Sequence, residues 1–66
     1  MIKSSYSRIT DYLKSKPGQY VTIQQIRNDV FFGGASWGNS AVRAIQDLKA
    51  SGRVQLSVNG DLRINQ

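Results

Sequence analysis

The C-terminal part of the chain most constrains its fold, because an amphipathic helical pattern there runs directly into a β-hairpin pattern. The helical pattern covers residues 39–50, with Asn39 as a favourable N-cap. Gly52 follows and supplies the left-handed residue that commonly ends a helix. Beyond it, apolar and polar residues alternate over residues 53–65, on both sides of a turn pair, Asn59-Gly60. A helix that leads straight into a two-stranded hairpin indicates a small α+β domain.

The register of the hairpin follows from which residues must share a face. A two-residue loop, Asn59-Gly60, would put the apolar residues of the two strands on opposite faces. A three-residue loop, residues 58–60, puts them on one face and places Gly60 in the left-handed position of a G1 bulge. We therefore expect these inward pairs: Val54 with Ile64 and Leu56 with Leu62. The outer face then carries Gln55, Ser57, Asp61 and Arg63, and the tip carries Val58.

Two further helical patterns lie upstream, with a short β-prone segment between them. Ser4 or Ser5 can cap the first pattern, residues 5–15, and Pro17 follows its end. The β-prone segment covers residues 20–22, and a T-x-x-Q capping box at residues 22–25 opens the second pattern, residues 23–32. The predicted order is helix, short strand, helix, helix and hairpin.

Composition limits the partners and the chemistry. A chain of 66 residues has room for one core, so it is expected to form a single domain. Nine Lys and Arg against four Asp give a net charge of +5, which favours a polyanionic partner or simply keeps a small protein soluble. Because the chain has no Cys and no His, disulfides and the common zinc sites are excluded.

Catalysis and membrane insertion are not expected. Without His, Cys or Glu, a nucleophile and its base would have to come from Ser, Lys, Asp or Tyr, and no spacing suggests such a pair. The glycines form no phosphate loop, so no cofactor or small-molecule ligand is implied. No apolar run approaches the roughly 18 residues that span a bilayer. We expect a cytoplasmic protein, nucleoid-associated if it binds DNA.

Residues 39–54 resemble the recognition helix and first wing strand of bacterial and phage winged helix-turn-helix regulators. In that family, the recognition helix begins with small polar residues and continues with an R-A-[IL]-x-x-L motif. A glycine and then a β-branched strand residue follow the motif. Those places are filled here by Arg43-Ala44-Ile45, Leu48, Gly52 and Val54. Residues 21–26 are similar to the family's short strand and the start of its second helix. The resemblance implies a winged helix-turn-helix: three helices, a C-terminal β-hairpin wing, and a short strand before the second helix.

The same resemblance implies double-stranded DNA binding, by a small transcriptional regulator or chromosome-binding protein. In the family, the third helix enters the major groove with its N-terminal half and outer face. The positions that match here are Ser36, Asn39, Ser40, Arg43 and Gln46. Arg can pair with guanine, and Asn or Gln with adenine. The same residues can also be ordinary solvated helix positions, and Asp47 beside them would repel phosphate.

Basic residues elsewhere are candidates for phosphate contacts. The family's wing lies along the backbone or in the minor groove, which points to Arg53 and Arg63; Asp61 near the tip argues against deep insertion. Five more basic residues lie on or near the first two helices: Lys3, Arg8, Lys14, Lys16 and Arg27. Of these, Lys14 and Arg27 are predicted to contact DNA phosphates. Some of these cations can equally be solvated.

The chain departs from the family in one respect. The segment between the second and third helices, residues 31–38, is long, whereas three or four residues are usual there.

Other partners remain open. An exposed cluster of Phe31, Phe32 and Trp37 would favour a protein–protein module, whereas burial of these residues would favour DNA binding. Stacking by Trp37 and the tyrosines would favour RNA. At least one Phe is expected in the core. A single unit of this size makes few contacts, so a homodimer or fusion to a larger chain would be needed for useful affinity.

Overall fold

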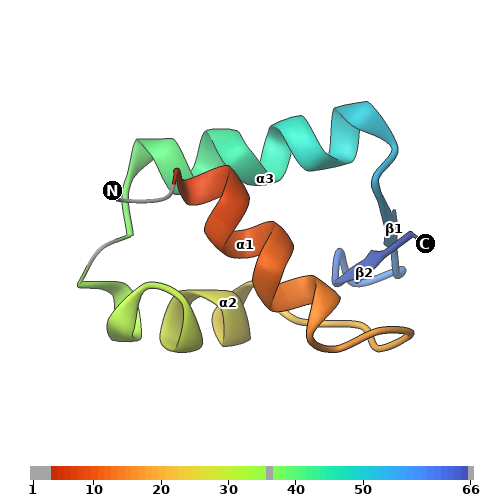
Figure 1. Ribbon diagram of the computed structural model, residues 1–66, viewed down its shortest axis with the longest axis horizontal. Coiled ribbons are helices and arrows are strands. Elements are labelled where there is room, and N and C mark those ends of the chain that lie inside the picture. Colours follow the sequence, from red (N-terminus) through yellow and green to blue (C-terminus); the bar gives the residue numbers. More distant parts are fainter. Residues whose placement is uncertain (1–3, 36, 66) are drawn as a thin grey trace.

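Three α-helices are followed by a two-stranded antiparallel hairpin in a computed structural model that describes residues 4–35 and 37–65 (Figure 1). The elements, in chain order, are α1 (Ser5–Lys14), α2 (Ile23–Asp29), a short 3-10 turn η1 (Phe32–Gly34), α3 (Asn39–Ser51), β1 (Val54–Leu56) and β2 (Leu62–Ile64). The small α+β class is therefore confirmed. Among the described helices, none is long and apolar enough to cross a membrane.

Helix α1 begins at a serine cap, as expected. The side chain of Ser4 accepts a hydrogen bond from the backbone N–H of Ser7 at 3.2 Å, so Ser4 rather than Ser5 is the cap. Ile9 and Leu13 are fully buried on the inner face. The helix ends at Lys14, one residue earlier than predicted, and Ser15 is its C-cap.

Helix α2 has the predicted capping box but is shorter than predicted. The N–H of Gln25 donates to the hydroxyl of Thr22, and the N–H of Thr22 donates to the side chain of Gln25, both at 3.0 Å. The helix ends at Asp29 rather than at residue 32. The reason is Phe31, which is 0% exposed: the chain leaves the helix to turn this ring into the core.

Helix α3 begins at Asn39, but Asn39 is not its N-cap as predicted. The carbonyl of Gly38 accepts the first helical bonds, from the N–H groups of Ala41 at 3.1 Å and Val42 at 3.2 Å, so Gly38 occupies the cap position. Asn39 is therefore the first helical residue. At the other end Gly52 is left-handed, with φ of 74°, and the predicted stop is confirmed.

The hairpin has the predicted register and loop. Its pairs are Val54 with Ile64, Gln55 with Arg63 and Leu56 with Leu62. The loop closes with bonds from the N–H of Ser57 to the carbonyl of Asp61 and from the N–H of Gly60 to the carbonyl of Ser57, both 3.0 Å. Gly60 has φ of 86°, as a G1 bulge requires.

The hairpin is joined to the segment before α2. Val21 and Leu62 exchange backbone hydrogen bonds of 2.7 and 2.9 Å, so the predicted strand at residues 20–22 is a single bridge beside β2. Both side chains are fully buried. Leu56, expected to face inward, is 49% exposed because it lies on the outer strand, towards the hairpin tip. Val58 is exposed at the tip, as predicted.

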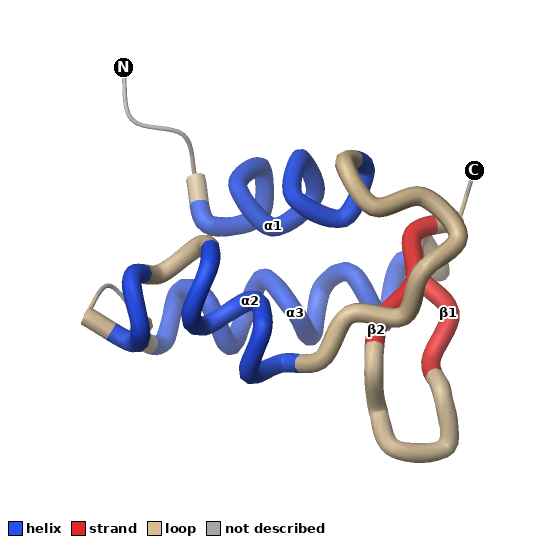
Figure 2. The backbone as a smooth tube through the Cα atoms, turned by 90° about the horizontal axis from the view of Figure 1, so that it is seen from below, coloured by secondary structure: helices blue, strands red, loops and turns tan. Residues whose placement is uncertain are grey.

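The core lies where the three helices meet the inner face of the hairpin. α3 packs against α1 and β1, and α1 also contacts β2. The buried apolar residues are Ile9, Leu13, Val21, Ile26, Val30, Phe31, Ala41, Ala44, Ile45, Leu48, Val54, Leu62 and Ile64. Figure 2 shows the hairpin at one end of the helical layer and the α2–α3 connection at the other.

A tyrosine on α1 holds the end of α2. The hydroxyl of Tyr12 donates to Oδ2 of Asp29 at 2.5 Å. Partial burial, followed by this hydrogen bond and the negative charge of Asp29, raises the pKa of Tyr12 to about 12. Because the raised pKa belongs to the folded state, the stability linked to it is present below the unfolded pKa of about 10 and is lost as the pH rises towards 12.

We predict that Tyr12→Phe lowers the free energy of unfolding by about 0.5–1.5 kcal/mol at neutral pH, the range of one hydrogen bond. The difference from the wild type should shrink between about pH 10 and 12, because ionised Tyr12 cannot donate to Asp29. Urea unfolding across that pH range measures this difference. A difference that stays constant up to pH 12 would contradict the assigned hydrogen bond.

We predict that Gly60→Ala costs about 1–2 kcal/mol of stability, because a Cβ disfavours the left-handed region. No atom lies within 4 Å of the position a Cβ would take, so the cost is in the backbone alone. Gly60→Asn is the matched control and should lose less, since Asn tolerates this conformation. Thermal or urea unfolding measures both variants, and equal losses would argue against the G1 bulge.

Candidate functional site

The face of α3 opposite the core is exposed and polar. Ala41, Ala44, Ile45 and Leu48 are buried against α1 and the hairpin. Their burial leaves Asn39, Arg43 and Gln46 on the outer side, all exposed. This arrangement follows from helical spacing, since residues three and four apart share a face. Three of the predicted contact residues thus lie along one accessible surface.

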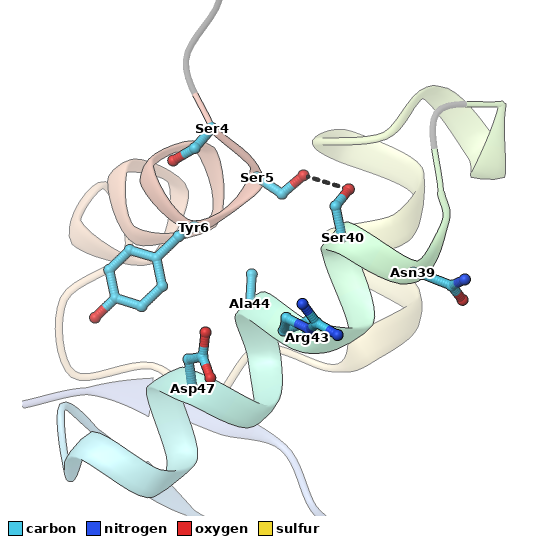
Figure 3. A pocket seen from close by; sticks show the side chains of 8 residues that line it. All are labelled: Ser4, Ser5, Tyr6, Asn39, Ser40, Arg43, Ala44 and Asp47. Carbon is cyan, nitrogen blue, oxygen red and sulfur yellow. Dashed lines mark hydrogen bonds between the residues drawn. The ribbon is translucent and has the colours of Figure 1, made fainter.

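A hollow of about 380 Å³ lies between the N-terminal ends of α1 and α3 (Figure 3). We call it the α1–α3 hollow; it is lined by Ser4, Ser5, Tyr6, Asn39, Ser40, Arg43, Ala44 and Asp47. The hydroxyl oxygens of Ser5 and Ser40 are 3.1 Å apart and hydrogen-bonded. Asn39, at the start of α3, points away from α1 in Figure 3. The hollow therefore places hydroxyl groups and one guanidinium side by side at the edge of the exposed face of α3.

The α1 residues of this hollow were not predicted from the sequence. Ser4, Ser5 and Tyr6 are far from α3 in the chain, and no spacing in the sequence marks them as its neighbours. They reach it only because α1 packs along α3. The signal that could have found them is the pairing of the apolar faces of these two helices, which needs the tertiary arrangement.

Opposite charges share the rim of the hollow. Arg43 and Asp47 are one helical turn apart on α3, both are exposed, and both line the hollow. The carboxylate of Asp47 reduces the attraction of this face for an anion. The helix face is consequently polar with a local cation, rather than uniformly basic.

The outer face of the hairpin holds Arg63 in place. Its guanidinium donates to the side-chain oxygen of Gln55 on the opposite strand and lies 5.1 Å from the centre of the Tyr20 ring. Arg63 is half-buried as a result. Arg53 precedes β1 and is exposed, and its carbonyl accepts a bond of 2.8 Å from the N–H of Asn65. The two arginines thus lie at different places on the hairpin: Arg53 at its base and Arg63 on its outer face.

The remaining predicted cations are distributed over α1 and α2. Lys14 is exposed at the end of α1. Arg27 is exposed on α2, with its guanidinium 5.9 Å from the centre of the Trp37 ring, so it lies along the α2–α3 connection. Neither lines the α1–α3 hollow. Ser36 and Lys3 lie outside the described residues.

Arg8, grouped with the possible phosphate contacts, faces inward instead. Its guanidinium donates to the carbonyl of Val30, the C-cap of α2, and lies 5.0 Å from the centre of the Phe31 ring. A cation at a helix C-terminus is favourable because the free carbonyls there carry partial negative charge. Arg8 therefore ties α1 to the end of α2.

The aromatic residues between α2 and α3 divide between core and surface. Phe31 is 0% exposed and meets Trp37 edge to face, with ring centres 5.5 Å apart. Trp37 is partly buried against the core. Phe32 is 70% exposed. The expectation that at least one Phe is buried is confirmed, and the three residues do not act as one cluster.

The chemistry of the site is that of hydrogen-bond donors and acceptors on an exposed surface. Arg43 offers five N–H donors, and the amides of Asn39 and Gln46 each offer a donor and an acceptor. Within residues 4–35 and 37–65, no three acidic side chains come together in a way that could hold a metal ion. Recognition of a ligand by polar contact is the chemistry that these groups support.

Comparison of the chain with known protein families, curated proteins and solved structures gives no match.

Proposed function

We propose that the protein is a winged helix-turn-helix that binds double-stranded DNA, with α3 in the major groove and the hairpin as its wing. One observation carries this proposal: the outer face of α3 presents Asn39, Arg43 and Gln46 to solvent, and the hairpin follows immediately after Gly52. An α-helix fits the width of the major groove, where its side chains can reach base edges. The net charge of +5 suits a polyanion.

Phosphate contacts supply most of the affinity in this proposal. Arg53 and Arg63 lie on the hairpin that follows α3, and Lys14 and Arg27 would flank them on the other helices. Each contact releases counterions from the DNA, which makes binding sensitive to salt. Arg63 is held by Gln55 and Tyr20, so little side-chain entropy is lost when it meets a phosphate.

Base discrimination comes from α3. Arg43 is suited to the two acceptors of guanine, and Asn39 and Gln46 to adenine. The wing lies along the backbone, because Asp61 beside its tip would be repelled in a narrow minor groove. We propose a small transcriptional regulator or chromosome-binding protein. It would act as a homodimer or within a larger chain, since one such unit makes few contacts.

We predict that Arg43→Ala weakens duplex binding by about 5- to 150-fold, the cost of a lost bidentate base contact. The matched control is Lys49→Ala, which removes the same charge from another exposed position of α3 outside the proposed face. Fluorescence anisotropy of a labelled duplex, at low and moderate salt, measures both. If Arg43 reads a base, the salt dependence stays unchanged while discrimination among duplexes is lost; if it contacts phosphate, the slope falls by about one.

Equal effects of Arg43→Ala and Lys49→Ala would reject Arg43 as a base contact, because any exposed cation of α3 would then serve as well. Absence of duplex binding by the wild type at low salt would reject the proposed function for this chain as tested.

We predict that Asp47→Asn strengthens duplex binding by roughly two- to tenfold, because it removes a negative charge from the flank of the proposed DNA-binding face. The gain should shrink as salt is raised, since screening weakens the repulsion. The control is Asp11→Asn on α1. The same anisotropy titration compares them, and a gain no larger than that of the control would place Asp47 away from the DNA.

A further inference from the structure

Phe32 has two features that the fold does not require. Its φ of 54° lies in the left-handed region, which is rare for a bulky side chain and costs on the order of a few kT. Its ring is 70% exposed, although Phe is usually buried. Gly33 and Gly34, which follow it, are also left-handed. Three successive left-handed residues therefore hold a large apolar ring at the surface.

The neighbouring Phe31 already does the packing. Phe31 is fully buried, meets Trp37 edge to face and lies under Arg8, so the core at this point is complete without Phe32. A polar residue that tolerates the left-handed region, such as Asn, would fill position 32 at a lower cost. An exposed, strained aromatic residue is a functional candidate because strain of this kind concentrates at binding sites.

The surroundings of Phe32 are cationic and rich in hydrogen-bond donors. The guanidinium of Arg8 lies 5.8 Å from the centre of its ring. A second hollow of about 380 Å³ adjoins the same connection and is lined by Gln24, Arg27, Asn28 and Gly33. Guanidinium and carboxamide groups beside an open aromatic ring suit a ligand that is anionic, planar and polar at its edges. A nucleotide combines these three properties.

We propose that Phe32 stacks on an unpaired base, so that the protein binds duplex DNA next to a single-stranded extension or an unpaired nucleotide more tightly than it binds a blunt duplex. This inference rests on the proposed function and extends it. The α2–α3 connection that carries Phe32 leads into the N-terminus of α3, at the end of the molecule away from the hairpin (Figures 1 and 2). A single strand that continues from a duplex bound along α3 would leave it at the end of the molecule where this connection lies.

A base is favoured over an apolar protein segment by the charges. A protein partner that buried Phe32 would also have to desolvate the exposed guanidinium of Arg27 in the adjoining hollow, which is costly unless an acidic group meets it. DNA supplies phosphates on each nucleotide, and every base offers a face for stacking. The guanidinium of Arg8 near the Phe32 ring lowers the electron density of that ring. A ring with less electron density stacks more favourably against an electron-rich purine.

The experiment compares one labelled duplex in two forms, blunt and with a three-nucleotide purine extension that contains 2-aminopurine. Anisotropy gives the affinities, and quenching of 2-aminopurine reports stacking. We expect the wild type to prefer the extended duplex by roughly 5- to 100-fold, the effect of stacking one base on an aromatic ring. Phe32→Trp should keep the preference and the quenching. Phe32→Leu, which stays apolar but lacks an aromatic face, should lose both.

Two controls separate stacking from damage to the fold. Phe32→Asn should unfold no more easily than the wild type, because Asn tolerates the backbone at this position, and it should bind the blunt duplex as the wild type does. Val58→Ala removes another exposed apolar side chain, at the hairpin tip, and should leave the preference intact.

The outcomes distinguish this inference from the proposed function. A wild type that binds both duplexes equally, or a preference that survives in Phe32→Leu, overturns the stacking role and leaves duplex binding standing; Phe32 would then be an anchor for a protein. If the blunt duplex is not bound but the extended duplex is bound and its 2-aminopurine is quenched in a Phe32-dependent way, the proposed function fails and the stacking role holds.

Discussion

Burial of Phe31 determines how the helices are connected. The ring occupies the point where α1, α2 and the α2–α3 connection meet, with Arg8 above it and Trp37 at its edge. To reach this position the chain must leave α2 after Asp29, and the freed carbonyl of Val30 is satisfied by Arg8. Phe32, the next residue, lies outside the core with a left-handed φ. The early end of α2 and the inward arginine are two results of placing one aromatic side chain in the core.

The positive charge of the chain is not spread freely over its surface. Among residues 4–35 and 37–65, four basic side chains lie over aromatic rings: Arg8, Lys16, Arg27 and Arg63. Pairing with a ring fixes the position of a long side chain but does not neutralise it. Arg27 and Arg63 are thus held in place by a ring while their charge remains available to an anion.

Features that depend on local chemistry could be predicted from the sequence. Gly52 and Gly60 marked a helix stop and a bulge, and the demand for one apolar face selected the hairpin register over its alternative. The capping box at Thr22 was equally local. The errors arose where two nearby residues compete. Asn39 is the better cap by residue type, yet Gly38 holds the position, and only packing decides that Phe31 goes inside and Phe32 outside. The α1–α3 hollow brings together distant segments, and nothing in the local sequence indicates Ser5 as a neighbour of Ser40.

The backbone bridge between Val21 and Leu62 has a consequence for how the hairpin behaves. It pairs a segment before α2 with a strand near the end of the chain, and both side chains lie in the common core. The hairpin is therefore part of the cooperative folding unit rather than an appendage that moves on a hinge. Its angle to α3 is set when the chain folds, so a partner that contacts both meets a preorganised surface. The fold would then select partners by their curvature, because neither α3 nor the hairpin can change its angle to the other without opening the core.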